Sequence, residues 1–106
     1  MTDPLDRLFA TITARRAAGD ADTSYPAKLL AGGVEKCAKK FGEEAVETAL
    51  AAVLGNKDHI AAESADVLYH LAVLWAAAGI TPEDVYAKLR AREGQSGLAE
   101  KAARKG

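Results

Sequence analysis

The fold of this chain is decided by residues 34–78, which read VEKCAKKFGEEAVETALAAVL, then GN, then KDHIAAESADVLYHLAVLWAAA. Residues 34–54 and 57–78 are strong helix formers, apart from Gly42 in the first segment. Gly55-Asn56 between them is typical of a helix end. Two helices joined by so short a turn pack antiparallel. The sequence therefore predicts an antiparallel helical hairpin as the centre of the fold.

Shorter helices are predicted on both sides of the hairpin. Pro4 and Pro82 each stand just inside a helix start, and Thr81 is a typical N-cap. Gly32-Gly33 ends a brief helix before the hairpin. The predicted short helices cover 4–16, 25–31 and 82–92, with a loop over 17–24. Residues 94–97 are expected to break the last helix, and residues 98–106 to form a weak helix or a partly disordered tail.

Length and composition favour one all-α domain over residues 1–106. The chain has 49% hydrophobic but only 6% aromatic residues, and much of the apolar content is alanine, which favours helix over strand. A hairpin with three short helices makes a thin core. Val46, Leu50 and Val53 would remain beside or opposite the face of Glu44, so we expect a homodimer assembling as a helical bundle.

Charge and hydropathy exclude several partners. The net charge is -1, which gives no broad basic surface for a nucleic acid. The longest apolar run, residues 71–80, is too short to span a membrane, and the N-terminus has no secretory signal pattern. A single cysteine, Cys37, fits a reducing cytoplasm, and we expect it to be a small buried residue.

Four acidic residues occupy helix positions at which apolar, core-facing residues would be expected. Glu44 and Glu47 are spaced i, i+3 in the first long segment, and Glu63 and Asp66 have the same spacing in the second. Both pairs are predicted to lean toward the core. On antiparallel helices the pairs can face each other and focus about four negative charges on one point.

Two explanations remain for these acids. The first is ordinary ion pairing, since Lys40 precedes Glu44 by one turn and Lys39 precedes Glu43 by four residues. The second is a divalent cation, for which Mg²⁺, with Mn²⁺ as a substitute, is the best match to carboxylate oxygen. No Glu has a His three residues later, which argues against a di-iron site. Walker-type and His-Glu-x-x-His motifs are also missing.

The strings KKFGEEAVE (39–47) and ESADVLYH (63–70) resemble the all-α nucleotide pyrophosphatase superfamily, whose shared core is Glu-x-x-Glu plus Glu-x-x-Asp. Further pieces narrow the resemblance to the phosphoribosyl-ATP pyrophosphatases, the second enzymes of histidine biosynthesis. These pieces are Arg15, Ser24-Tyr25 with Leu29, and Arg92 with Ser96-Gly97 and Glu100-Lys101. The resemblance covers nearly the whole chain. It implies an enzyme that hydrolyses phosphoribosyl-ATP to phosphoribosyl-AMP and pyrophosphate with Mg²⁺.

The resemblance also implies roles for individual residues. The metal ligands, and thereby the catalytic acids, would be Glu44, Glu47, Glu63 and Asp66. Lys40 is the expected phosphate contact because it lies one turn from Glu44. Further candidate substrate contacts are Tyr25, Arg15, Lys28 and Arg92, although basic residues on short helices usually serve solubility. His70 is expected in the core or behind the ligands, since imidazole suits Mg²⁺ poorly.

Two other functions compete with this one. The chain could be a housecleaning pyrophosphatase acting on dUTP, dCTP or a damaged nucleotide, against which the Ser24-Tyr25 and Ser96-Gly97 matches argue. It could also be a non-enzymatic helical dimerisation module, in which the acids only pair with Lys39 and Lys40. Metal binding and substrate preference separate the three.

Overall fold

The computed structural model describes residues 3–19 and 21–93, and this part of the chain is all-α, as predicted. Its helices are α1 (Pro4–Ala18), α2 (Tyr25–Ala31), α3 (Gly33–Leu54), α4 (Lys57–Ala78) and α5 (Pro82–Arg92). The predicted tail, with Ser96, Gly97, Glu100 and Lys101, lies outside the described residues.

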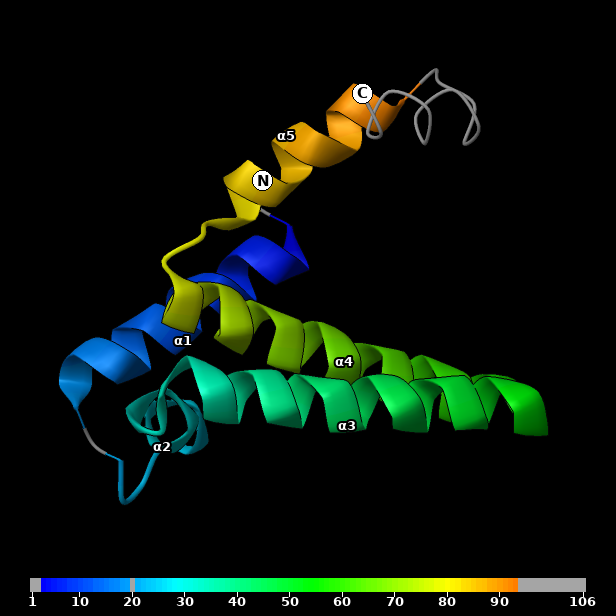
Figure 1. Cartoon of the computed structure of the whole chain (residues 1–106), viewed down its shortest axis with the longest axis horizontal. Coiled ribbons are helices and arrows are strands. Elements are labelled where there is room, and N and C mark those ends of the chain that lie inside the picture. Colours follow the sequence, from blue (N-terminus) through cyan, green and yellow to red (C-terminus); the bar gives the residue numbers. More distant parts are fainter. Residues whose placement is uncertain (1–2, 20, 94–106) are drawn as a thin grey trace.

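The predicted hairpin is the longest feature of the molecule. Helices α3 and α4 run side by side in opposite directions (Figure 1). Gly55 adopts the left-handed conformation that a side chain disfavours, with φ of 82°, and its N–H donates to the Ala51 carbonyl. The Asn56 side chain then accepts the His59 N–H at 3.0 Å. The same two residues therefore end one helix and begin the next.

Helix α1 is longer than the sequence indicated. The loop was predicted to begin at residue 17, but the helix continues through Ala18 and ends at Gly19, whose φ is 70°. The Gly19 N–H donates to the carbonyls of Arg15 and Arg16. The correction follows from helix-end chemistry: alanine continues a helix, and the first residue able to turn left-handed ends it.

The hydrophobic core lies at one end of the hairpin. It consists of buried side chains from α1, α2, the first turns of α3 and the last turns of α4, namely Ile12, Leu29, Leu30, Cys37, Ala72, Val73 and Ala76. Beyond these helices the hairpin continues uncovered (Figure 1). Val46, Leu50, Val53 and Leu54 on this uncovered half of α3 are exposed. Cys37 is buried, as expected for a small core residue.

Helix α4 is long and apolar enough, by length and composition alone, to cross a membrane. Core helices pass the same test, and α4 packs on α1, α2 and α3 while carrying Glu63 and Asp66.

Candidate metal centre

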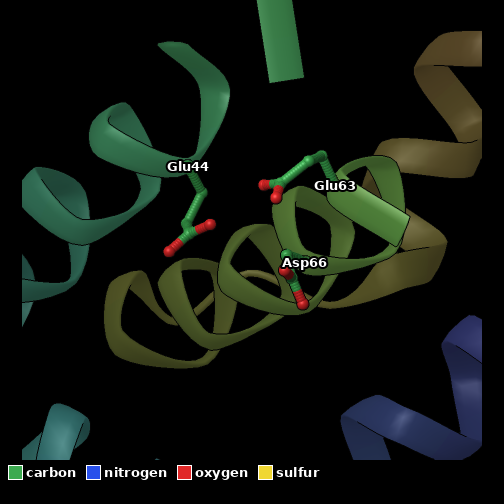
Figure 2. Close-up of side chains that lie close together, drawn as sticks. All are labelled: Glu44, Glu63 and Asp66. Atoms are coloured by element: carbon green, nitrogen blue, oxygen red, sulfur yellow. The ribbon is translucent and has the colours of Figure 1, made fainter. Parts of the chain in front are cut away.

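The two long helices bring three of the four predicted acids together. One carboxylate oxygen from each of Glu44, Glu63 and Asp66 lies within 4.8 Å of the others. Figure 2 shows Glu44 reaching from α3 toward Glu63 and Asp66 on α4. The i, i+3 spacing puts both α4 acids on one side of that helix, and the antiparallel packing turns this side toward Glu44. We call these three side chains the acid cluster.

The acid cluster lies at the edge of the hairpin rather than in its core. Glu44 is buried, with 8% of its surface exposed, and Glu63 is partly buried, whereas Asp66 and Glu47 are exposed. The prediction that both acid pairs lean toward the core is therefore wrong for Glu47 and for Asp66. A spacing of three residues spreads two side chains over about 60° of helix circumference, so one turns inward and the other toward solvent.

One oxygen of the cluster has no protein partner. Glu63 Oε2 is buried and accepts no hydrogen bond within the described residues. A buried carboxylate oxygen without a donor is costly unless something else neutralises it. Carboxylate oxygens are also the donor set that a hard divalent cation prefers. Both observations fit a cation held between α3 and α4.

The charges of the acid cluster also act on Glu47, although Glu47 lies at the exposed edge of the cluster. The negative charge of Glu44 is the main cause that raises the pKa of Glu47 above its usual value, with further contributions from desolvation and Glu63. Negative charge is therefore concentrated here in the absence of a cation, and Glu47 remains close enough to feel a charge bound at the cluster.

Glu44 is supported from two sides by its neighbours. His70, buried on α4, places Nε2 3.9 Å from Glu44 Oε1, and desolvation lowers the His70 pKa. His70 is buried, as expected. On the other side, the Thr48 hydroxyl lies 2.9 Å from the Glu44 carbonyl and 3.1 Å from that of Glu63. Thr48 thus ties together the two backbones that carry the cluster.

Lys40 is a lysine next to the cluster. Its Nζ lies 3.5 Å from Glu44 Oε1 and 3.7 Å from Glu43 Oε1. The pKa of Lys40 is raised, chiefly by the Tyr25 hydroxyl and then by Glu44 and Glu43. The alternative pairing of Lys39 with Glu43 is not formed: Lys40, one residue later, is rotated toward both glutamates. A single lysine cannot neutralise the whole cluster.

Tyr25 reaches the site from α2. Its ring lies nearly parallel to that of Tyr69, with centroids 6.2 Å apart, and edge-on to His70 at 5.9 Å. Tyr25 is about half exposed. The structure therefore puts Tyr25, a candidate substrate contact, near enough to Lys40 to affect its charge, with about half of its surface exposed.

The other three candidate contacts lie near the ends of α1, α2 and α5. Arg15 ends α1 and Lys28 lies in the last turn of α2; both are exposed and form no ion pair with the described residues. Arg92 is the last residue of α5, which packs mainly on α1. The resemblance in sequence suggested these three residues as substrate contacts but could not show whether they lie together in the fold.

Sequence reasoning missed the role of Thr48. Its position on the Glu44 face was evident from the helical period, but threonine is also common as an ordinary helix residue. Only the approach of α4 supplies the second carbonyl, so no sequence signal would have found it.

The chain is similar to known proteins over most of its length. Residues 5–93 match the family described as phosphoribosyl-ATP pyrophosphohydrolase. The chain is 62% identical to a phosphoribosyl-ATP pyrophosphatase of Parvibaculum lavamentivorans, over 94% of this chain and 91% of that protein. It is 60% identical to one of Azospirillum brasilense, over 95% and 90%, and 58% identical to one of Rhizorhabdus wittichii, over 98% and 97%. This chain is a hydrolytic enzyme and belongs to the phosphoribosyl-ATP pyrophosphohydrolase family.

Proposed function

We propose that this enzyme hydrolyses phosphoribosyl-ATP to phosphoribosyl-AMP and pyrophosphate, the second step of histidine biosynthesis, with Mg²⁺ held by the acid cluster and Glu47. Full-length similarity to relatives with that name supports the substrate. Two observations support the metal: the carboxylates of Glu44, Glu63 and Asp66 converge, and the buried Glu63 Oε2 has no donor among the described residues. Mn²⁺ would substitute, because it accepts the same oxygen ligands.

The metal would be held by Glu44 from α3 and by Glu63 and Asp66 from α4, with Glu47 beside them. When bound, Mg²⁺ neutralises charge on phosphate oxygens and lowers the pKa of a water molecule. The protein's own part is to hold these oxygens in position. Thr48 keeps the two helices in register, and buried His70 packs behind Glu44.

Lys40 and Tyr25 would contact the substrate next to the metal. Lys40 presents a positive charge one turn from Glu44 and would attract a phosphate group of the substrate. Tyr25 offers an exposed ring and hydroxyl on the same side. Because the acids themselves do not recognise the base, the choice of nucleotide must come from residues outside the cluster.

A competition assay tests the proposed function. Equimolar phosphoribosyl-ATP, ATP, dUTP and dCTP are offered with Mg²⁺, and each product is quantified by chromatography. We expect much the highest kcat/KM on phosphoribosyl-ATP, since discrimination is a ratio of efficiencies. Preferential cleavage of dUTP or dCTP would instead indicate a housecleaning pyrophosphatase. Absence of any cleavage with Mg²⁺ or Mn²⁺ would contradict the metal-dependent reaction altogether.

We further propose that the working form is a homodimer. On the uncovered half of α3, Val53 and Leu54 are 84% and 79% exposed, and Val46 and Leu50 continue the same apolar surface. A monomeric protein rarely exposes such a patch. Since the acid cluster lies next to this half of the hairpin, a second copy packed there would also limit the access of water. The buried free thiol of Cys37 fits a reducing cytoplasm as the location.

A further inference from the structure

A basic groove lies beside the acid cluster, where α2 ends and α3 begins. It has a volume of about 500 Å³ and is lined by Leu29, Gly32, Glu35, Lys36, Lys39, Lys40 and Glu43. Small-ligand sites commonly fall in the range of about 300–1,000 Å³. The groove reaches the acid cluster through Lys40, which contacts Glu44 at 3.5 Å. A ligand held at the cluster can therefore extend into the groove.

The groove is lined by more lysines than glutamates. Of its two glutamates, Glu43 is paired with Lys40 at 3.7 Å. Neither Lys36 nor Lys39 forms an ion pair within the part of the chain that the structure describes, and both are exposed. Unpaired ammonium groups in a concave surface favour an anion, and most of all a phosphate.

Gly32 makes room for one of these lysines. A Cβ at this position would lie 2.3 Å from Lys36 Cδ, so any other residue would push the lysine away. The backbone itself does not require glycine here, because φ is -79° and ψ is -7°. The aliphatic stem of Lys36 thus lies against Gly32, and both residues line the groove.

The groove lies at a distance that suits a long substrate. Lys36 precedes Glu44 by eight residues, which is roughly 12 Å along the axis of α3. Phosphoribosyl-ATP carries a triphosphate at one end and a phosphate monoester at the other, separated by two riboses and a purine. Such a molecule needs two anion sites, and only one of them can be the metal.

We propose that Lys36 and Lys39 bind the phosphate monoester of the phosphoribosyl group and so select this substrate over plain nucleoside triphosphates. The inference rests on the proposed function and names residues that it leaves open. The acid cluster and Lys40 would hold the end that is cut, and the groove would hold the opposite end. Glu35, which also lines the groove, would disfavour a more highly charged group and so keep the triphosphate at the metal.

The test measures binding of two ligands that differ at the proposed site. Dissociation constants for phosphoribosyl-AMP and for ATP are determined by calorimetry with Mg²⁺, using the parent protein and the double variant Lys36→Gln with Lys39→Gln. We expect at least tenfold weaker binding of phosphoribosyl-AMP and nearly unchanged binding of ATP. The matched control is Lys57→Gln with Lys88→Gln, which removes the same charge from exposed positions on α4 and α5 and should change neither constant.

Two glycine-to-alanine variants test whether the position of Lys36 matters while its charge is kept. Gly32→Ala should weaken binding of phosphoribosyl-AMP, though less than the double variant does. Gly42→Ala, whose added Cβ meets nothing within 4 Å, is the control. Unchanged affinity in Gly32→Ala would overturn the role of Lys36. Equal weakening of both ligands in the lysine variant, or weakening of neither, would overturn the inference. Failure of the parent in the competition assay would instead overturn the proposed function.

Discussion

The hydroxyl of Thr48 on α3 lies 3.1 Å from the backbone carbonyl oxygen of Glu63 on α4. The same hydroxyl is 2.9 Å from the carbonyl of Glu44, one turn earlier in its own helix. A threonine hydroxyl has one proton, so it donates to either carbonyl or is shared between them. The contact joins the backbone of one cluster residue to that of another, and it thereby sets how far α3 can slide along α4.

Replacing Thr48 by valine should loosen the acid cluster without dismantling the fold. The side chain keeps its shape but loses the donor, so we expect the free energy of unfolding to fall by about 1 kcal/mol. We also expect apparent Mg²⁺ affinity to fall about tenfold, as is typical when a group that orients metal ligands is removed. Urea unfolding and Mg²⁺ titration of activity measure the two effects. Thr48→Ser should restore both, and a valine variant with parental Mg²⁺ affinity would contradict the role.

Removing a charge from the acid cluster should abolish metal binding. In Glu44→Gln and Asp66→Asn we expect turnover to disappear, because an amide is a poor replacement for a carboxylate ligand. In the parent, Mg²⁺ at a hundred times its Kd should stabilise the native state by about 2.7 kcal/mol. Thermal melts with and without Mg²⁺ should show this rise in Tm in the parent and far less of it in the variants. Asp22→Asn, exposed in the loop before α2, is the matched control. Retained activity in both cluster variants would refute the assignment.

Glu47→Gln should stabilise the protein in the absence of metal while reducing activity. The Glu47 pKa is raised above 4.5, mainly by Glu44, so its ionised form is disfavoured in the native state. Glu47 therefore stabilises the folded state at pH values below the pKa that it has in the unfolded chain. This stabilisation is lost as the pH rises through the pKa that Glu47 has in the folded protein. The amide variant should therefore melt higher than the parent at pH 7 with a chelator, and the difference should vanish below pH 4.5. A variant that melts at a lower temperature than the parent at pH 7 would show that the charges of the acid cluster do not act on Glu47.

The uncovered half of α3 should carry the dimer interface. Leu50→Glu with Val53→Glu puts charge on exposed apolar positions, so it should separate the copies while each hairpin stays folded. Light scattering at micromolar concentration should give twice 11.1 kDa for the parent and 11.1 kDa for the variant. Leu89→Glu, at an exposed apolar position on α5, is the control and should remain dimeric. A parent mass of 11.1 kDa would reject the dimer.

The start of α5 should make stability depend on acid pH. Thr81 and Asp84 form a reciprocal cap in which the Thr81 N–H donates to Asp84 at 2.9 Å, and this hydrogen bond is the main cause of the lowered Asp84 pKa. A lowered carboxyl pKa contributes stability above its unfolded value of 3.8 that is lost as pH falls through the folded value. Asp84→Asn should therefore lower Tm at pH 7 and matter little well below pH 3.8. The control Asp58→Asn, which removes an exposed acid in the first turn of α4, should keep the parental pH profile. An identical change in both variants would exclude the cap as its cause.

Much of the local structure was readable from the sequence, because the signals that determine it are local. Gly55 and Asn56 end and begin helices through their own backbone conformation and side chain, and Thr81 caps α5 in the same way. The i, i+3 spacing of Glu63 and Asp66 places both on one side of a helix whatever surrounds it. The all-α class, the hairpin and the candidate acids followed from such features. The bounds of α1 were less certain because alanine permits a helix without ending one.

Only the tertiary structure decided which groups meet. Helical periodicity defines the faces of α3 and α4, but their rotation and axial register depend on packing against α1 and α2 at one end of the hairpin. That packing turned Glu44 inward and left Glu47 at the rim, brought Thr48 to the Glu63 carbonyl, and opened the groove beside Gly32. Burial and contact between residues far apart in the sequence arise from the sum of many weak apolar contacts, and no local pattern of residues encodes that sum.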